Sequence, residues 1–310
     1  MGKGLRITVP VTMTDAIVTA TDVPEADYPA WAIGSTYALA DRVIHKHVIW
    51  QSTAAGNVGN DPSTAGAAYW QKVSATNRWK LFDLEQVTST AQATSMYYEL
   101  QPGAPTTALH VLGLSKVTSV RVRVYDLNAS GALVYDSGLR SAGLLPIRPD
   151  WWHYFFGPWD ISEEQHYSEL PYISNPKIRV DFAGDTDMSV QVLMIGNDST
   201  FATTDGYGVV ADLGIRVDRV AQSGLNDFDI PTLEVGTAYS TVGFDLILPS
   251  RDVDQLMRWY RRSGRKSCLF TISEQWSSTQ LIGAITVFKA VINGPTRSTF
   301  SFEIQGVPQQ

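Results

Sequence analysis

Cysteine is almost absent from this chain, because Cys268 is the only one among 310 residues. A single thiol excludes an internal disulfide, and folding in a reducing compartment is the natural expectation. The first residues, Met-Gly-Lys-Gly-Leu-Arg, lack the apolar core of a secretory signal, and no run approaches the roughly 20 apolar residues of a membrane span. We therefore expect a chain that is neither disulfide-bonded internally nor inserted into a membrane.

Basic residues are in the minority, with 24 Lys and Arg against 31 Asp and Glu, for a net charge of −7. An acidic chain without a basic stripe argues against nucleic-acid binding and against docking on an anionic membrane surface. The sequence also lacks a Gly-x-Ser-x-Gly elbow, a phosphate-binding loop and a His-Glu-x-x-His motif. We therefore predict no catalytic residues, no cofactor and no enzymatic activity.

Helix signals are scarce, whereas Thr, Val, Ser and aromatic residues are frequent and 24 Gly and 15 Pro interrupt the chain. This composition is typical of short strands joined by turns. One helix is predicted at about residues 252–262, since Val253, Leu256, Met257 and Tyr260 recur at helical spacing. Ser250 or Asp252 would cap its start, and Gly264 would end it.

The predicted fold is mainly β, and the length suggests several units. We expect an N-terminal strand segment (1–25), a small aromatic-rich β module (26–83), a jelly-roll-like β-sandwich (84–200), a linker near 198–206, and a C-terminal β-rich unit with one helix (207–310). In the sandwich, the alternation over 117–125 places Val120, Val122 and Val124 inward and Arg121 and Arg123 outward. Further strands are predicted at 177–182, 189–195, 244–248, 269–272, 283–290 and 298–304.

The aromatic module carries Trp31, Tyr37, Val43, Trp50, Pro62 and Tyr69-Trp70 in this order. The order resembles small carbohydrate-binding modules of the chitin-binding type, which implies sugar contact through Trp31, Tyr37, Trp50 and Trp70. The loop 53–60 lacks the exposed tandem aromatics of such modules. We therefore expect Trp50 and Trp70 to build the core, which leaves Trp31 and Tyr37 as candidates for a glycan and leaves a pure spacer as the alternative.

Three segments, 23–31, 57–62 and 76–83, resemble a family of tailed-bacteriophage virion proteins, and Thr76-Asn-Arg-Trp79 is the most specific of them. The similarity extends to 214–219 and to the closing 302–306, whereas 221–228 departs from it. The resemblance implies a structural component of a tail tip or baseplate, located in the virion and made in the host cytoplasm. Its implied partners are other tail-tip proteins, copies of itself in a symmetric assembly, and host cell-surface polysaccharide. The alternative is a virion-associated enzyme that degrades polysaccharide.

The densest aromatic run lies between residues 151 and 159. It is predicted to be an assembly interface, because Trp and Tyr anchor protein–protein contacts. A core strand beside a Gly-Pro turn is the competing interpretation. The residues assigned to this interface are Trp151, Trp152, Tyr154, Phe155 and Trp159.

The remaining polar candidates favour ordinary structural roles. His45 and His47 lie two apart on a predicted strand and would share one face. No third ligand for a metal is evident near them, so we expect an exposed pair of side chains. Acidic residues near strand ends could supply oxygens to calcium or belong to ordinary turns; they are Asp181, Asp185, Asp187 and Asp198. Glu163 and Glu164 are adjacent, which alone does not indicate a glycosidase site. Cys268 is predicted to be a small buried apolar residue.

Overall fold

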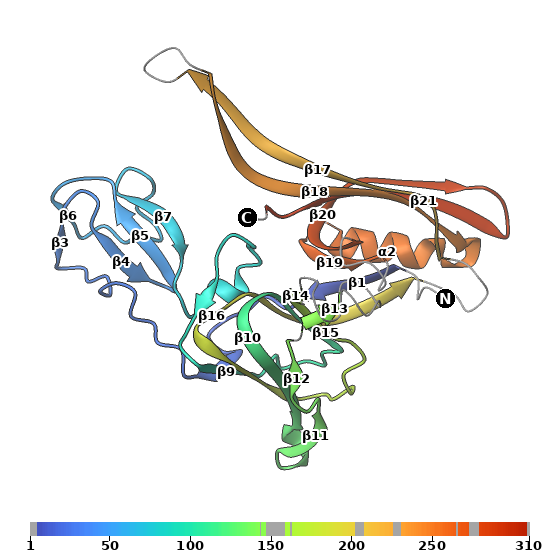
Figure 1. Cartoon of the computed structure of the whole chain (residues 1–310), viewed down its shortest axis with the longest axis horizontal. Coiled ribbons are helices and arrows are strands. Elements are labelled where there is room, and N and C mark those ends of the chain that lie inside the picture. The colour runs from blue at the N-terminus through green and yellow to red at the C-terminus, as the bar shows by residue number, and fades with distance from the viewer. Residues whose placement is uncertain are drawn as a thin grey trace.

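The computed structural model describes residues 5–142, 144–146, 159–161, 163–201, 208–225, 231–264, 266–272 and 279–308. Only the backbone is described for 144–146, 159–161, 208–212, 219–225 and 231–237. The chain is mainly β with a single α-helix among the described residues, as predicted. Figure 1 shows the aromatic module on one side, a sandwich-like body in the centre and the C-terminal sheet beyond it.

The aromatic module consists of short strands. Three of them form one small sheet, β4 (Arg42–His45), β5 (Val48–Ser52) and β7 (Trp70–Ala75), while β3 (Thr36–Tyr37) pairs with β6 (Asn57–Val58). The β4–β5 turn consists of Lys46 and His47, with φ of 51° and 63°. This left-handed pair matches the twist of a hairpin. The prediction that His45 and His47 share one strand face is therefore wrong, because His47 lies in the turn.

Two long strands build the sandwich-like body. β10 (Ala108–Asp126) and β16 (Pro176–Phe201) pair along most of their length, with bulges between Ser115 and Ser119. The bulges bend both strands, so that their two halves enclose one core. The remaining strands extend this sheet: β2 (Val18–Thr21), β8 (Thr90–Ala91), β9 (Ser95–Leu100), β11 (Ala132–Asp136), β12 (Arg140–Ser141) and β15 (Glu164–Tyr167).

The alternation predicted for 117–125 is confirmed, since Val120, Val122 and Val124 are buried and the intervening arginines are only partly covered. The strands predicted at 177–182 and 189–195 are parts of the single strand β16, because the chain bends there without leaving the sheet. A separate pair joins β13 (Leu144–Pro146) to β14 (Trp159–Ile161). Short 3₁₀ turns occur at η1 (Lys80–Phe82), η2 (Leu127–Ala129) and η3 (Ser250–Asp252).

The C-terminal unit packs one helix against an antiparallel sheet. It contains β17 (Gly208–Leu225), β18 (Pro231–Pro249), α2 (Val253–Ser263), β19 (Cys268–Thr271), β20 (Gln280–Ile292) and β21 (Arg297–Gly306). The predicted helix is confirmed to within one residue at each end. Gly264 ends it in a right-handed conformation, φ −65°, and donates its N–H to the Tyr260 carbonyl. Asp252 occupies the N-cap position without a side-chain hydrogen bond.

The N-terminal strand β1 (Leu5–Pro10) connects the body to the C-terminal unit. It pairs with β16 on one side and β19 on the other, so one sheet runs in the order β11-β10-β16-β1-β19-β20-β21-β18-β17. Leu5 and Ile7 are fully buried in the second core, beneath α2 and the C-terminal strands. The linker expected near 198–206 is corrected at its start, because Asp198–Phe201 pair with β1. Strand alternation alone does not reveal such a partner, which lies almost 200 residues away.

Candidate functional site

Two of the four predicted sugar-contact rings are held inside the module. Trp70 is 2% exposed, and its indole Nε1 donates to the Asn60 carbonyl at 2.9 Å. The Tyr37 ring meets Trp70 edge-on at 5.2 Å between centroids, and the Tyr37 hydroxyl accepts the Ala32 N–H at 2.7 Å. The pair therefore fastens the loop around Ala32 to the module core. The burial of Trp70 agrees with its predicted structural role.

The other two rings surround His45. Trp31 meets the His45 ring edge-on at 5.1 Å, and the Trp50 Nε1 donates to the His45 carbonyl at 3.2 Å. The Trp31 Nε1 is buried and has no hydrogen-bond partner among the described residues. Trp31 and the Tyr37–Trp70 pair thus make edge-on contacts, and Trp50 makes a hydrogen bond to the backbone. Sugar contact through the partly buried Trp31 and Tyr37 stays a prediction.

The aromatic run predicted as an assembly interface lies mostly outside the described residues. Trp151, Trp152, Tyr154 and Phe155 belong to the part of the chain that the structure does not describe, and only the backbone of Trp159 is described. That backbone pairs with Pro146 in the small β13–β14 sheet. The interface hypothesis therefore stays a prediction.

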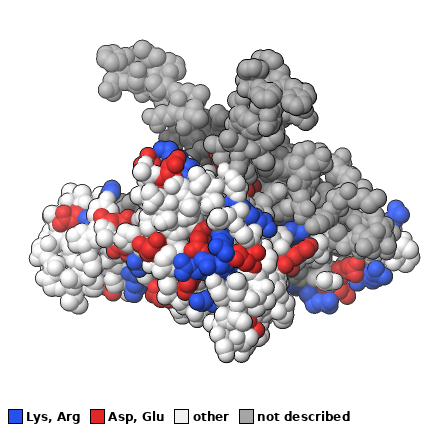
Figure 2. All heavy atoms as spheres, turned by 60° about the horizontal axis from the view of Figure 1, so that its bottom comes forward, with Lys and Arg blue, Asp and Glu red and all other residues white. Residues whose placement is uncertain are grey.

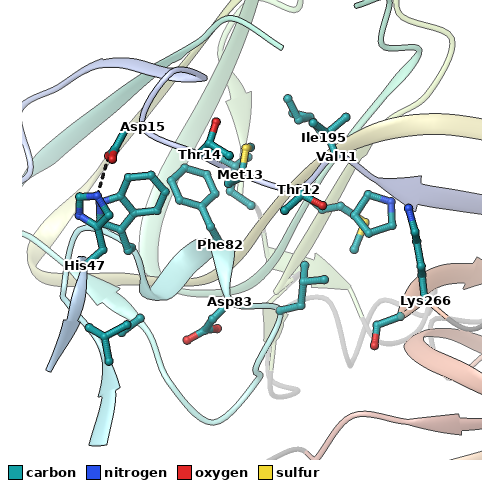
Figure 3. A pocket seen from close by; sticks show the side chains of 18 of the residues that line it. Val11, Thr12, Met13, Thr14, Asp15, His47, Phe82, Asp83, Ile195 and Lys266 are labelled. Carbon is teal, nitrogen blue, oxygen red and sulfur yellow. Dashed lines mark ion pairs between the residues drawn. The ribbon is translucent and has the colours of Figure 1, made fainter. Parts of the chain in front are cut away.

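A cleft of about 730 Å³ lies where the aromatic module, the body and the loop after α2 meet. Figure 3 shows Phe82 near its middle, His47 at one end and Lys266 at the other. Its floor is apolar and comes from the segment after β1 and from β16. The apolar and aromatic lining residues are Val11, Met13, Trp79, Phe82, Leu84, Leu193 and Ile195.

His47 fastens the module to the wall of this cleft. Its ring stacks on Trp79 at 4.2 Å between centroids, its Nδ1 lies 2.9 Å from the Glu25 carboxylate, and its Nε2 lies 2.5 Å from Asp15 (Figure 3). Asp15 precedes β2 and belongs to the body, whereas His47 lies at the tip of the β4–β5 hairpin. The hairpin turn thus carries the imidazole that contacts the body.

Asp83 is the half-buried acid of the cleft. Burial raises its pKa to about 6, although its oxygens accept hydrogen bonds from the Glu85 N–H and the Thr88 hydroxyl. The arrangement offers an aromatic and apolar wall beside a carboxyl group that gains a proton in weak acid. Reasoning from the sequence missed this cleft. The spacing of Trp79 and Phe82 over one helical turn was the available signal, since residues three apart share a face.

A second feature that the sequence did not reveal is a chain of polar side chains across β1, β10, β15 and β16, buried at Thr8 and His110 and partly exposed at His166 and Glu164. The Thr8 hydroxyl donates to Asp198 at 2.5 Å and lies 2.9 Å from His110 Nε2. His110 Nδ1 lies 2.9 Å from His166 Nδ1, and His166 Nε2 lies 3.3 Å from Glu164. We call these five residues the polar chain. It crosses the body at the junction with the C-terminal unit.

The hydrogens of the polar chain can be assigned from its donors. Because Thr8 has one hydroxyl hydrogen and gives it to Asp198, the oxygen must accept from His110 Nε2–H. A neutral His110 then accepts from His166 at Nδ1. Burial lowers the pKa of His110, and the His166 and Arg6 charges add to this effect against the attraction of Asp198. Burial alone would raise the pKa of Asp198, but the Thr8 hydroxyl that donates to it and the nearby His110 imidazole, whose Nε2 lies 3.8 Å away, bring it below its ordinary value.

The polar chain does not have the layout of a catalytic triad. In a triad the imidazole lies between the nucleophile and the acid, whereas here the Thr8 hydroxyl lies between His110 and Asp198. Thr8 is also fully buried, so no substrate reaches its oxygen. The polar chain is instead a hydrogen-bonded link between the four strands β1, β10, β15 and β16.

The acidic residues considered for calcium are dispersed. Asp181 binds Arg123 and Arg179, Asp187 binds Lys116, and Asp198 belongs to the polar chain. The described residues contain no group of three or more His, Cys, Asp or Glu arranged to hold a metal ion. The described residues therefore do not form a shared oxygen cluster, and Asp181, Asp187 and Asp198 already lie beside cations.

Cys268 is fully buried in the second core, as predicted. Burial raises the pKa of its thiol to about 11. A thiol of this kind carries little thiolate at neutral pH and is a poor nucleophile. Its packing beside Phe270 is that of a small apolar side chain.

Charges of both signs are mixed on the face that Figure 2 presents, where Lys and Arg lie beside Asp and Glu. One set of ion pairs connects neighbouring strands of the body: Arg121 to Asp136, Arg123 to Asp181, and Arg179 to Glu99. A surface on which positive and negative charges are mixed does not build up the positive electrostatic potential that attracts a polyanion. This agrees with the absence of a basic stripe in the sequence.

Two comparisons with known proteins by sequence gave no match. No protein-family model matches the chain, and no curated protein matches it by sequence. Among the helices that the structure describes, none has the length and apolar character to cross a membrane.

Proposed function

We propose that the protein is a structural component of a bacteriophage tail tip or baseplate, in which it packs against other virion proteins. The observation that carries this proposal is the shape of the β17–β18 hairpin. β21 pairs with β18 only over Thr241–Pro249, so within the described part of the chain residues 231–240 pair with β17 alone. This two-stranded part, residues 217–225 and 231–240, is called the ribbon, and Figure 1 shows it projecting away from the body.

A two-stranded ribbon is only marginally stable in water without a third strand or a packed face. Ribbons of this kind gain stability when a neighbouring subunit supplies the missing contacts. A chain that carries an extended ribbon, a packed body and a separate side module suits a position between other components of an assembly. A freely diffusing enzyme has no such need.

Attachment to a host glycan is the second part of the proposal, and a spacer role for the module is its alternative. The resemblance of the module supports glycan contact, whereas the use of Trp50, Trp70 and the Tyr37 hydroxyl in internal contacts favours the spacer. The polysaccharide-degrading enzyme remains the alternative, and it would need two carboxylates placed on either side of a glycosidic bond.

Particle composition tests the structural role. Mass spectrometry of purified virions should detect the chain, and replacing residues 217–240 by a short turn should leave a folded protein that particles no longer incorporate. A virion that lacks the wild-type chain contradicts the proposal.

Binding to host polysaccharide separates the roles of the module. Glycan attachment predicts that Trp31→Phe weakens binding of the purified protein to polysaccharide extracted from host cells, whereas a spacer binds none. Release of reducing sugar from the same polysaccharide would favour the enzymatic alternative.

A further inference from the structure

β17 is the last strand of the long sheet. Among the described residues it pairs with β18 and with no other strand, so its second edge is unpaired. An unpaired edge presents backbone N–H and C=O groups that readily pair with another strand. The described side chains on this edge are those of residues 213–218.

The apolar face of β17 continues beyond the core. Ile215 pairs with Val242, which is fully buried, and paired residues point to the same face of a sheet. Leu213 still packs against the second core. Ile215 is 44% exposed and Val217 is 59% exposed, so an inward-facing stripe becomes uncovered as it leaves the body.

The opposite face of the same residues carries charges of both signs. Arg216 and Asp218 alternate with Ile215 and Val217, and their side chains meet at 2.8 Å. Arg216 is exposed, so this contact has the weak energetics of a surface ion pair. Along β17 the order is therefore a positive charge at Arg216, an apolar residue at Val217 and a negative charge at Asp218.

We propose that the unpaired edge of β17 binds the same edge of a second copy of this chain, antiparallel and centred on Val217. An antiparallel pair about this residue places Val217 opposite Val217 of the second copy and Arg216 opposite its Asp218, twice by symmetry. The two apolar stripes then lie side by side and extend the core across the interface. The charge order is self-complementary, which is what a two-fold interface requires.

A different partner fits the edge less well. A strand of single charge would leave either Arg216 or Asp218 facing a like charge, which destabilises a cross-strand pair. A second copy satisfies both charges without any further condition. The inference rests on the proposed function, since it names the partner that stabilises the ribbon.

Cysteine cross-linking tests the register. Directly opposite residues of an antiparallel pair lie roughly 4.5–5.5 Å apart at Cα, which is within disulfide range. Val217→Cys should give a covalent dimer under mild oxidation, seen on a non-reducing gel. Tyr172→Cys is the matched control, because this loop residue is 79% exposed and should cross-link only by collision. The native Cys268 is buried and should not contribute.

Charge exchange tests the recognition. Arg216→Asp places like charges opposite each other twice and should weaken dimerisation, measured by sedimentation, by about tenfold or more. The double variant Arg216→Asp and Asp218→Arg restores the alternating order and should recover the wild-type affinity. Recovery together with selective cross-linking at position 217 supports the proposal.

Three results would overturn it: a wild-type chain that stays monomeric at high concentration, equal cross-linking at positions 172 and 217, or a double variant that does not recover. None of these results bears on whether virions contain the chain, which particle composition decides separately.

Discussion

His110 should make the free energy of unfolding depend on pH, although Asp83 offsets most of this effect in the wild type. Its imidazole is 1% exposed and its pKa lies below the ordinary value of 6.5, whereas the unfolded chain takes up a proton near that value. Stability is therefore lost as the pH falls below about 6.5. If the folded state keeps His110 neutral, the loss between pH about 6.5 and about 5.5 is about 1 kcal/mol.

Asp83 acts in the opposite direction over the same interval. Its folded pKa of about 6 exceeds the ordinary 3.8, so the folded state binds a proton that the unfolded state leaves in solution. The free energy of unfolding therefore rises by about 0.7 kcal/mol as the pH falls from about 6.5 to about 5.5. The two contributions largely cancel, leaving a net loss of roughly 0.3 kcal/mol in the wild type. Asp198, with its lowered pKa, stays ionised throughout and contributes only at stronger acidity.

Replacing Asp83 should uncover the contribution of His110. We expect the free energy of unfolding of Asp83→Asn to fall by about 1 kcal/mol between pH about 6.5 and about 5.5. The double variant Asp83→Asn with His110→Gln should lose about 1 kcal/mol less than the single variant over the same fall in pH. The assay is urea unfolding at both pH values, followed by tryptophan fluorescence. Equal pH dependence in the single and double variants would refute the protonation of a buried His110 as the cause.

Three further outcomes test the packing. Trp70→Ala should destabilise the module by about 3–5 kcal/mol, seen as an earlier unfolding transition, since it empties a buried site; a shift below about 1 kcal/mol would show that the ring is not part of the core. Gly196→Ala should cost about 1–3 kcal/mol in urea unfolding, because its methyl group would lie 2.3 Å from the Val9 carbonyl oxygen, whereas Gly214→Ala meets no atom within 4 Å and should be nearly neutral. Cys268 should react with a thiol reagent only after unfolding, and rapid labelling of the native protein would contradict its burial.

Local patterns in the sequence were sufficient to predict the strand alternation at Val120, Val122 and Val124 and the helix near residues 253–263. Both depend on neighbours along the chain, since side-chain direction repeats every second residue in a strand and about every 3.6 residues in a helix. The burial of Trp70 was predicted from the order of rings in the module, and that of Cys268 from its apolar character. These features needed no knowledge of the partner elements.

The sites could not be predicted in this way. The polar chain joins Thr8, His110, His166 and Asp198, which no spacing connects, and the cleft combines the turn at His47 with segments from the whole length of the chain. Strand alternation also gave His47 the wrong direction, because His47 lies in the turn between β4 and β5.

The sequence by itself therefore determined the fold class, the helix and the inward side of several strands, because these follow from short-range periodicity and propensity. Only the tertiary structure decided that β1 joins two cores, that β16 is one bent strand and that β17 ends the sheet with an uncovered apolar stripe. Strand pairing is a long-range choice that many registers satisfy locally, and the packing of the whole chain selects one of them.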